Sequence, residues 1–421
     1  MISLRTFLFF LILLVIFLIV LLIVSAVMRR VWKGWRYANL DRMRAHYAKM
    51  LIGAVDSGTI KNTMNDYTAR PTSLKWQAIE DVLLSMITRE KYTEQARELC
   101  SGLGYTGFYE KVMGKKDVIG QAASIDKLGR MASSSSTPKL IGMLDSENGE
   151  AVSAAVKSLC RMNSLEGMRA ILERLPVILG KANVSQRVLE TSLVKFGTAA
   201  VPEFVEHAKR YGDERSLQTI LEVLAVVQSR EALPFILECL DHKDGDVRAT
   251  ALKAVITNAQ DIRGFIGKKV VRLTQDPEWY VRLHAAKVLG ELRYAKELDA
   301  IGKLLLDSNW HVRTAAVASL TKMGNASLEV FLKTLRSQQD DFYVVGSICE
   351  EIEKNLFVFR LFENLKSGDQ QVRQQSREIL EIMYAIDFYS PFLEYMTSGD
   401  DEEVKKEISR IVSAKQGPVL S

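Results

Sequence analysis

The sequence lacks the closely spaced side chains that most catalytic and metal sites need. Its four cysteines are scattered over 421 residues, at Cys100, Cys160, Cys239 and Cys349. Its five histidines are equally scattered. No zinc-site spacing or disulfide framework is present, and isolated cysteines are typical of a reducing compartment. We therefore expect no catalytic residue, no cofactor and no metal site, and we predict that the protein is not an enzyme.

A strand pattern is also missing. Gly102, Gly104 and Gly107 spell G-x-G-x-x-G, but they follow the helix-forming segment TEQARELC, which begins at Thr93, and not a strand. A dinucleotide site needs a strand before and a helix after that motif. We interpret the glycines as a helix end and a turn, and we predict an all-α fold.

What the sequence does contain is one long apolar run, the eighteen residues from Phe7 to Val24. Extended to Met28, the run reaches the ~20 residues that cross a bilayer. Side chains of this kind favour insertion by about 5 to 11 kcal/mol in total. We predict a transmembrane anchor over residues 1–28. A cleaved secretory signal is the alternative, and the length of the run and the single preceding basic residue, Arg5, disfavour it.

A basic segment follows this run. Residues 29–50 carry seven basic residues against the single acid Asp41, which leaves residues 51–421 with a net charge of −2 once Arg5 is counted. Because basic residues near a span resist translocation, we predict a single-pass protein of the inner membrane with a cytoplasmic C-terminal domain. The near-neutral body disfavours nucleic-acid binding. The candidate membrane-interface residues are Arg29, Arg30, Trp32, Lys33, Trp35 and Arg36.

Two interpretations of residues 29–50 stay open. The segment is either a topology signal on a short helix or an amphipathic juxtamembrane helix that binds anionic lipid. Residues 51–116 contain two further helical segments, which begin at Ser73 and Thr93. We interpret residues 51–116 as a helical cap that leads into the rest of the chain.

An internal repeat occupies residues 117–414. The segments DGDVR, DPEWYVR, DSNWHVR and DQQVR begin at Asp244, Asp276, Asp307 and Asp369. Aligning the apolar residue before the arginine position gives about ten units spaced 28 to 34 residues apart, indexed at Ile119, Val152, Val184, Leu217, Val247, Val281, Val312, Val344, Val372 and Val404. Mostly apolar residues recur four and eight positions later, as on a helix with one buried face. A shorter helix lies between these, so each unit is a helical hairpin. Hairpins this small must stack into an α-solenoid, and residues 415–421 form a C-terminal tail.

The repeated acids and arginines have a structural interpretation. We expect the four aspartates to cap helix N-termini. We also expect the Asp and Arg side chains to form ion pairs that fix the register of the stack, because a catalytic site is a single constellation and not a feature of every unit.

The pattern D-x-x-(W)-x-V-R-x-x-A-A, clearest at residues 276–286 and 307–316, resembles the bacterial HEAT-like repeats, including the short kind found in phycobilin lyases. This resemblance covers about 300 residues and implies an armadillo-like α-solenoid. One span, a helical lead-in and HEAT-like units are together similar to single-pass bacterial membrane proteins associated with polysaccharide-synthesising glycosyltransferases.

Aromatic residues recur at one place in three successive units. The candidate partner-binding residues are Trp279, Tyr280, Trp310, His311, Phe342 and Tyr343. Either Trp279, Trp310 and Phe342 fill the gaps between hairpins, which the sequence favours, or they anchor a partner. We expect the neighbouring Tyr280, His311 and Tyr343 to point outward.

The function predicted is a membrane-tethered scaffold that binds other proteins, membrane-associated ones included, at the cytoplasmic surface. A polysaccharide-synthesis complex is one such setting, and it follows from the resemblance alone. The alternative is a lyase-type enzyme with a small ligand in the solenoid. That alternative would need a pocket with converging polar groups.

Overall fold

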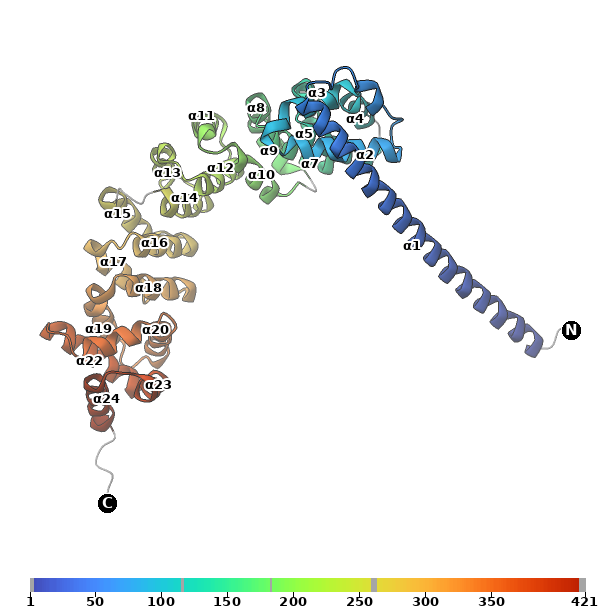
Figure 1. The fold of residues 1–421 in the computed structure, drawn as a ribbon. Helices are drawn as coiled ribbons and strands as arrows, with labels where there is room; N and C mark the ends of the chain where they lie inside the picture. Colours follow the sequence, from blue (N-terminus) through green and yellow to red (C-terminus); the bar gives the residue numbers. More distant parts are fainter. Residues whose placement is uncertain (1–3, 115–116, 182–183, 259–262, 416–421) are drawn as a thin grey trace. The chain divides into compact units, whose positions relative to one another are not determined.

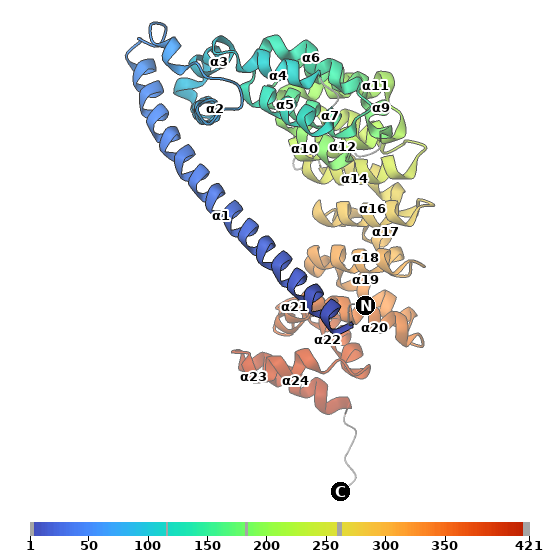
Figure 2. The same cartoon turned by 90° about the vertical axis from the view of Figure 1, so that its right-hand side faces the viewer.

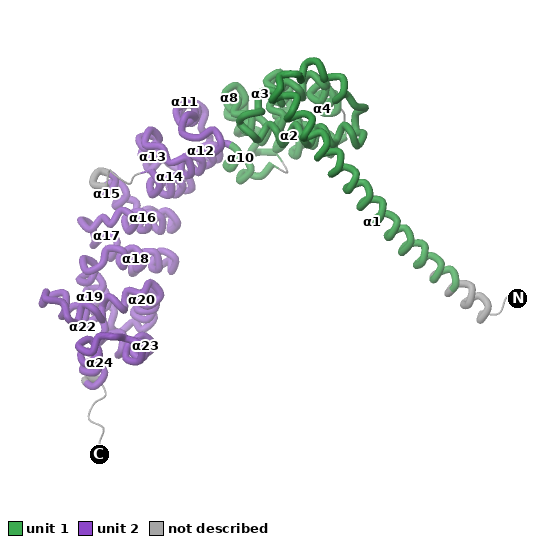
Figure 3. Tube along the Cα trace, viewed as in Figure 1, with its two compact units in different colours: residues 1–192 green, residues 193–421 purple. Residues whose placement is uncertain are grey.

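The computed structural model describes residues 4–114, 117–181, 184–258 and 263–415. The side chains of residues 4–12, Val15, Val118, 263–265 and 414–415 are also outside the described set. All regular structure in the described ranges is helical (Figures 1 and 2), which confirms the predicted all-α fold. The chain divides into two compact units, residues 1–192 and 193–421 (Figure 3).

The first unit begins with a single long helix and continues in short ones. Its helices are α1 (Leu4–Asp56), α2 (Leu74–Ile87), α3 (Thr93–Gly102), α4 (Tyr105–Met113), α5 (Val118–Met131), α6 (Thr137–Gly142), α7 (Gly149–Arg161), α8 (Leu165–Glu173), α9 (Leu175–Gly180) and α10 (Gln186–Leu193). Short 3-10 helices lie at Met64–Tyr67, Glu90–Tyr92, Ser134–Ser136 and Met143–Asp145. The two helices expected from Ser73 and Thr93 are therefore confirmed, and the Ser73 side chain caps α2 by accepting from the Trp76 N–H.

The C-terminal part of α1 packs against other helices. Among the described side chains of α1, the first buried one is Leu40, and from there the helix lies along α2. Arg44 of α1 donates to Asp81 of α2 at 3.0 and 2.5 Å, which fastens the two helices. The basic segment 29–50 is therefore the middle of one continuous helix and has no boundary of its own.

The core of the first unit is aromatic. Trp76 of α2 and Tyr105 of α4 have ring centroids 3.8 Å apart, and the Tyr105 hydroxyl donates to the Trp76 carbonyl at 3.0 Å. Leu51 of α1 lies in the same cluster, so this core holds the end of α1 in place. Gly104, with φ of 85°, makes the sharp turn between α3 and α4 that the glycine motif predicted.

The second unit is a stack of hairpins. Its helices are α11 (Val201–Tyr211), α12 (Glu214–Val227), α13 (Leu233–Cys239), α14 (Gly245–Asn258), α15 (Arg263–Arg272), α16 (Trp279–Glu291), α17 (Leu298–Leu304), α18 (Trp310–Lys322), α19 (Leu328–Ser337), α20 (Phe342–Lys354), α21 (Phe357–Asn364), α22 (Gln370–Ala385), α23 (Ser390–Ser398) and α24 (Glu402–Lys415). Short 3-10 helices lie at Val194–Phe196, Thr198–Ala200, Arg230–Ala232, Leu273–Gln275, Ala295–Glu297 and Gly324–Ser327. The helices α12, α14, α16, α18 and α20 pack side by side in that order (Figure 2).

The predicted buried face is correct in the middle of the stack. In α16 the residues Val281, Ala285 and Leu289 are all buried, and the equivalent positions of α14 and α18 are buried too. Close helix contact explains the small side chains. A Cβ on Gly290 of α16 would lie 2.8 Å from the Cα of Ser319 in α18, so only glycine fits there.

The predicted buried face is wrong in two early units, those indexed at Ile119 and Val184. Ile119 is 77% exposed, and the described buried residues of α5 are Ser124, Ile125, Leu128, Gly129 and Met131 instead. Val184 precedes α10, whose buried face begins at Leu189. Polar and small residues occupy buried positions of these helices, so apolar periodicity alone placed the face one or two residues early. Of the predicted tail, residues 416–421 lie outside the described residues.

Candidate functional site

A ladder of ion pairs links successive hairpins of the second unit. Arg248 of α14 donates to both carboxylate oxygens of Asp276 at 2.8 and 2.7 Å. Arg282 of α16 repeats the arrangement with Asp307, at 2.6 and 2.8 Å. The third guanidinium nitrogen of each arginine donates to carbonyls just before its own helix. Two of the four aspartates, Asp276 and Asp307, thus form the predicted ion pairs between units.

The four aspartates do not share one role. Asp244 and Asp369 stand three residues before the index valine and accept from the N–H groups at the helix start, as expected of caps. Asp276 and Asp307 stand five residues before it, and each accepts from the N–H of the residue two positions on, which is outside the helix. The prediction that all four cap helices is therefore wrong for Asp276 and Asp307.

The candidate aromatic residues lie at one end of three adjacent helices. Trp279, Trp310 and Phe342 are the first residues of α16, α18 and α20. Trp310 is 57% exposed and Phe342 is 70% exposed. Trp310 and Phe342 therefore do not fill gaps between hairpins, whereas Trp279 is 39% exposed and stacks on His311. We call the six candidate residues the aromatic edge.

Part of the aromatic edge is a stack of rings. His311 lies 3.6 Å from Trp310 and 5.4 Å from Trp279 between ring centroids, with interplanar angles of 30° and 19°. The three rings join the starts of α16 and α18 into one surface. Packing of this kind holds large side chains in place while they remain accessible.

The expectation for the neighbouring residues is met at two positions. Tyr343 is 73% exposed and His311 is exposed, as predicted. Tyr280 is half-buried, so its predicted outward position is wrong. Burial and the nearby carboxylates of Asp246 and Glu278 raise the pKa of the Tyr280 hydroxyl above its ordinary value.

A groove of about 530 Å³ opens beside the aromatic edge, between α18 and α20. Trp310, Phe342 and Phe388 form its apolar part. Arg313 of α18 lines it as well, with its guanidinium 5.8 Å from the ring centroid of Tyr343. The groove therefore combines a cation with accessible aromatic surface.

The acids of this groove are already paired. Glu350 and Glu351 both contact the Lys354 ammonium, at 2.7 and 3.2 Å. Both carboxylates are therefore engaged by the same cation.

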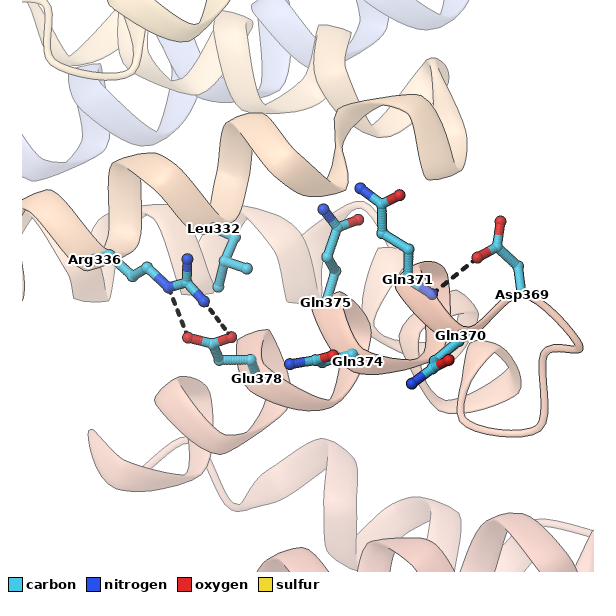
Figure 4. A pocket seen from close by; sticks show the side chains of 8 residues that line it. All are labelled: Leu332, Arg336, Asp369, Gln370, Gln371, Gln374, Gln375 and Glu378. Carbon is cyan, nitrogen blue, oxygen red and sulfur yellow. Dashed lines mark hydrogen bonds and ion pairs between the residues drawn. The ribbon is translucent and has the colours of Figure 1, made fainter.

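Among the other grooves of the second unit, two differ clearly in their lining. One, of about 490 Å³, runs between α19 and α22, and its Arg336 and Glu378 close on each other in a two-bond ion pair (Figure 4). The other, of about 940 Å³, is apolar and lined by Tyr384, Phe392 and Leu393. Sequence analysis identified neither groove, because each is formed by helices that are adjacent only after folding.

The candidate membrane-interface residues all lie on α1. Arg29, Arg30, Trp32, Lys33 and Trp35 are exposed and Arg36 is half-buried, with its guanidinium 5.5 Å from the Trp32 ring centroid. A search of the described part of the chain finds no helix long and apolar enough to cross a membrane. The side chains of residues 7–12 and Val15, which belong to the predicted anchor, lie outside the described residues.

No catalytic or metal constellation was predicted. Among the described residues, no group of three or more His, Cys, Asp or Glu side chains is placed to hold a metal ion. Sequence analysis did not identify Arg313 as a candidate site residue, although the sequence contains a signal for it. The position five residues before the index valine holds Asp276 and Asp307 in two units. In the next unit the same position holds Gln339, which has no charge to pair with Arg313.

The family comparison identifies the type of repeat in part of the chain. Residues 268–348 match the family model of HEAT repeats. A search of curated proteins gives no match. Among solved structures, an engineered protein is similar over 81% of this chain and 96% of its own length, with 15% identity and a TM-score of 0.36.

Two larger solved structures are similar as well. Kap121p has 12% identity and a TM-score of 0.44, over 88% of this chain and 51% of its own. Kap95p, in a structure whose title describes its binding to RanGDP, has 13% identity and a TM-score of 0.41, over 83% of this chain and 56% of its own.

Proposed function

We propose that the HEAT-like repeat domain of this chain is a non-enzymatic scaffold that holds another protein. The observation that carries the proposal is the aromatic edge. Trp310, Phe342 and Tyr343 are each more than half exposed, and they stand together at the ends of adjacent helices next to a groove. Exposed Trp and Tyr residues of this kind are typical anchors of protein interfaces.

The distribution of polar groups supports a scaffold over the lyase-type alternative. Arg248 and Arg282 of the ladder hold hairpins together, and Glu350 and Glu351 of the groove both contact Lys354. An enzyme of the alternative kind would need one site whose acid and base are set apart from this repeated pattern.

The scaffold proposal includes a membrane tether formed by the first part of α1, with the repeats on the cytoplasmic side. In its support, every described apolar residue from Leu13 to Val24 is exposed on α1, and Trp32 and Trp35 follow among basic residues. Exposed apolar helices are stable in lipid and not in water. The partner would accordingly be a membrane-associated protein, with anionic lipid bound by the basic segment.

Photo-crosslinking tests the scaffold. We would place p-benzoylphenylalanine at Phe342 in the full chain and irradiate intact membranes. We expect a discrete crosslinked partner whose recovery falls at least fivefold when Trp310→Ala is added. Tyr211, 56% exposed at the end of α11, is the matched control position and should give no such partner. Equal recovery of the crosslinked partner from both positions, or recovery that is unchanged by Trp310→Ala, would refute the scaffold role of the aromatic edge.

The tether needs its own test. Alkaline carbonate extraction should leave the full chain with the membrane, whereas a chain that begins after Met28 should be released. Protease added to sealed inside-out vesicles should degrade the repeats. Release of the full chain by carbonate would remove the tether from the proposal and leave the protein-binding role untouched.

A further inference from the structure

The ion-pair ladder has a regular form that one unit breaks. In two successive units, the arginine just after the index valine binds an aspartate of the next unit. That aspartate stands five residues before the index valine of its own unit. The Arg248 and Asp276 side chains are 12% and 5% exposed, and those of Arg282 and Asp307 are 16% and 8% exposed. Each arginine is therefore matched by a carboxylate shielded from water.

At the third step the arginine is present and the carboxylate is missing. Arg313 occupies the position of Arg248 and Arg282, and one of its nitrogens donates to the carbonyls of Asp307 and Ser308, at 2.9 and 3.3 Å. The residue at the acid position is Gln339, which is exposed. Within the described ranges no carboxylate forms an ion pair with Arg313, and its buried Nε has no hydrogen-bond partner.

Three acids of α20 and of its N-cap make other contacts. Asp341 accepts from the N–H groups of Tyr343 and Val344 and so caps α20. Glu350 and Glu351 contact Lys354. A buried donor left without an acceptor is destabilising, because it has lost its hydrogen bonds to water. A carboxylate supplied from outside would remove that cost.

We propose that Arg313 binds the carboxylate of an Asp or Glu residue in an extended segment of the protein partner, while Trp310 and Phe342 take an apolar residue beside it. The inference rests on the proposed scaffold function and specifies the chemistry of the partner. The carboxylate takes the Nε and Nη2 edge of the guanidinium, as Asp276 and Asp307 do in the neighbouring steps. The Tyr343 ring lies near this guanidinium, and Tyr343 is 73% exposed.

The charges of the groove favour a carboxylate over a phosphate. Glu350 and Glu351 line the same groove as Arg313. A phosphate group carries close to two negative charges near neutral pH and would be repelled more strongly by these acids than a singly charged carboxylate. The partner segment is therefore acidic and apolar, and its binding does not depend on phosphorylation.

Peptide selection on the full chain tests this inference. The probe is a phage-displayed library of random nine-residue peptides, selected on detergent-solubilised protein. We expect enrichment of peptides in which Asp or Glu lies within two residues of a Leu or an aromatic residue. A fluorescent peptide made from the consensus should lose at least tenfold in affinity on Arg313→Gln and should bind normally to the control Arg336→Gln.

A second variant separates binding from folding. Gln339→Asp restores the missing acid of the ladder, so it should raise the resistance of the protein to urea and also weaken the consensus peptide at least tenfold. A merely structural role of Arg313 would not link higher stability to weaker binding. Unweakened binding to Gln339→Asp would overturn the carboxylate site.

The remaining outcomes are equally decisive. Selection of apolar peptides without acids, or tighter binding of a phosphoserine peptide than of its glutamate equivalent, would overturn the carboxylate site and leave the scaffold proposal standing. Selection of no peptide would also overturn it. The scaffold proposal fails only when the crosslinking at Phe342 fails as well.

Discussion

The guanidinium of Arg282 binds both carboxylate oxygens of Asp307, a residue that begins the next hairpin, at 2.6 and 2.8 Å. Two more hydrogen bonds hold the pair. The Asn309 N–H donates to the Asp307 carboxylate, and the Arg282 guanidinium donates to the Asp276 carbonyl. Burial opposes ionisation of Asp307, but the hydrogen bonds from Arg282 and Asn309 outweigh it and hold the pKa of Asp307 below its ordinary value. The pair therefore stays ionised and fixes the register of α16 against α18.

Asp307→Asn should destabilise the second unit by about 3 kcal/mol, because it leaves the shielded Arg282 guanidinium without its counter-charge. The measurement is the free energy of unfolding in urea, followed by circular dichroism at 222 nm. Glu291→Gln is the matched control. It removes an ion pair with Lys322 between the same two helices, but both side chains are nearly half exposed, so its cost should stay below about 1 kcal/mol. Equal losses from the two variants would contradict a special role of the ladder.

Gly290→Ala should destabilise the same interface by roughly 1 to 3 kcal/mol. The new Cβ would lie 2.8 Å from the Ser319 Cα, so α16 and α18 would have to move apart. Gly346→Ala in α20 is the control, because nothing lies within 4 Å of its added Cβ. There the better helix propensity of alanine should raise stability by up to about 1 kcal/mol. Thermal midpoints of both variants, measured side by side, decide the prediction.

Much of the stack was predictable because the residues that define each unit lie close together in the sequence. The valine, alanine and leucine positions of α16 and α18 repeat at helical spacing, and the Asp and Arg positions recur with them. The early units were harder. The buried face of α5 includes Ser124, whose hydroxyl donates to the Gly120 carbonyl, so a buried residue there looks like a surface residue in the sequence.

The candidate site depended on information that the repeat does not hold. The sequence identified the aromatic residues but favoured the wrong environment for Trp310 and Phe342, because exposure at a helix start depends on where the neighbouring hairpin ends. The missing partner of Arg313 is recognised only when the acid position of one unit is compared with the arginine of the unit before it. The periodicity within a single unit does not reveal which units pair.

The cysteines should be unreactive in the folded protein. Burial raises the pKa of Cys100, Cys239 and Cys349 to about 12, and all four cysteines are buried. The thiolate is the reactive form, so Ellman's reagent at pH 8 should modify less than one thiol per chain within an hour. Addition of guanidinium chloride should expose four. Rapid modification of the native protein would show that its helices open more readily than their packing implies.

His284 of α16 should make the second unit sensitive to mild acid. Burial, with the nearby cations of Lys253 and Lys287, lowers the pKa of His284 to about 4. Between that value and the ordinary value of ~6.5 in the unfolded chain, the unfolded state takes up a proton that the folded state does not. The contribution of His284 to stability is therefore intact above pH ~6.5 and decreases as the pH falls toward 4. Because the imidazole is partly exposed and screened, we expect a loss of about 1 kcal/mol between pH 7 and pH 5.

The variant His284→Gln isolates this contribution, because glutamine is polar and does not titrate in the range. The free energy of urea unfolding, measured at pH 7 and pH 5, should fall less in the variant than in the parent chain by that same ~1 kcal/mol. Lys253→Gln should also reduce the pH dependence, since removing a neighbouring cation allows the pKa of His284 to rise toward its ordinary value. Equal pH dependence in all three proteins would mean that His284 is solvated in the folded state, and that α14 and α16 do not pack around it as closely as their contacts indicate.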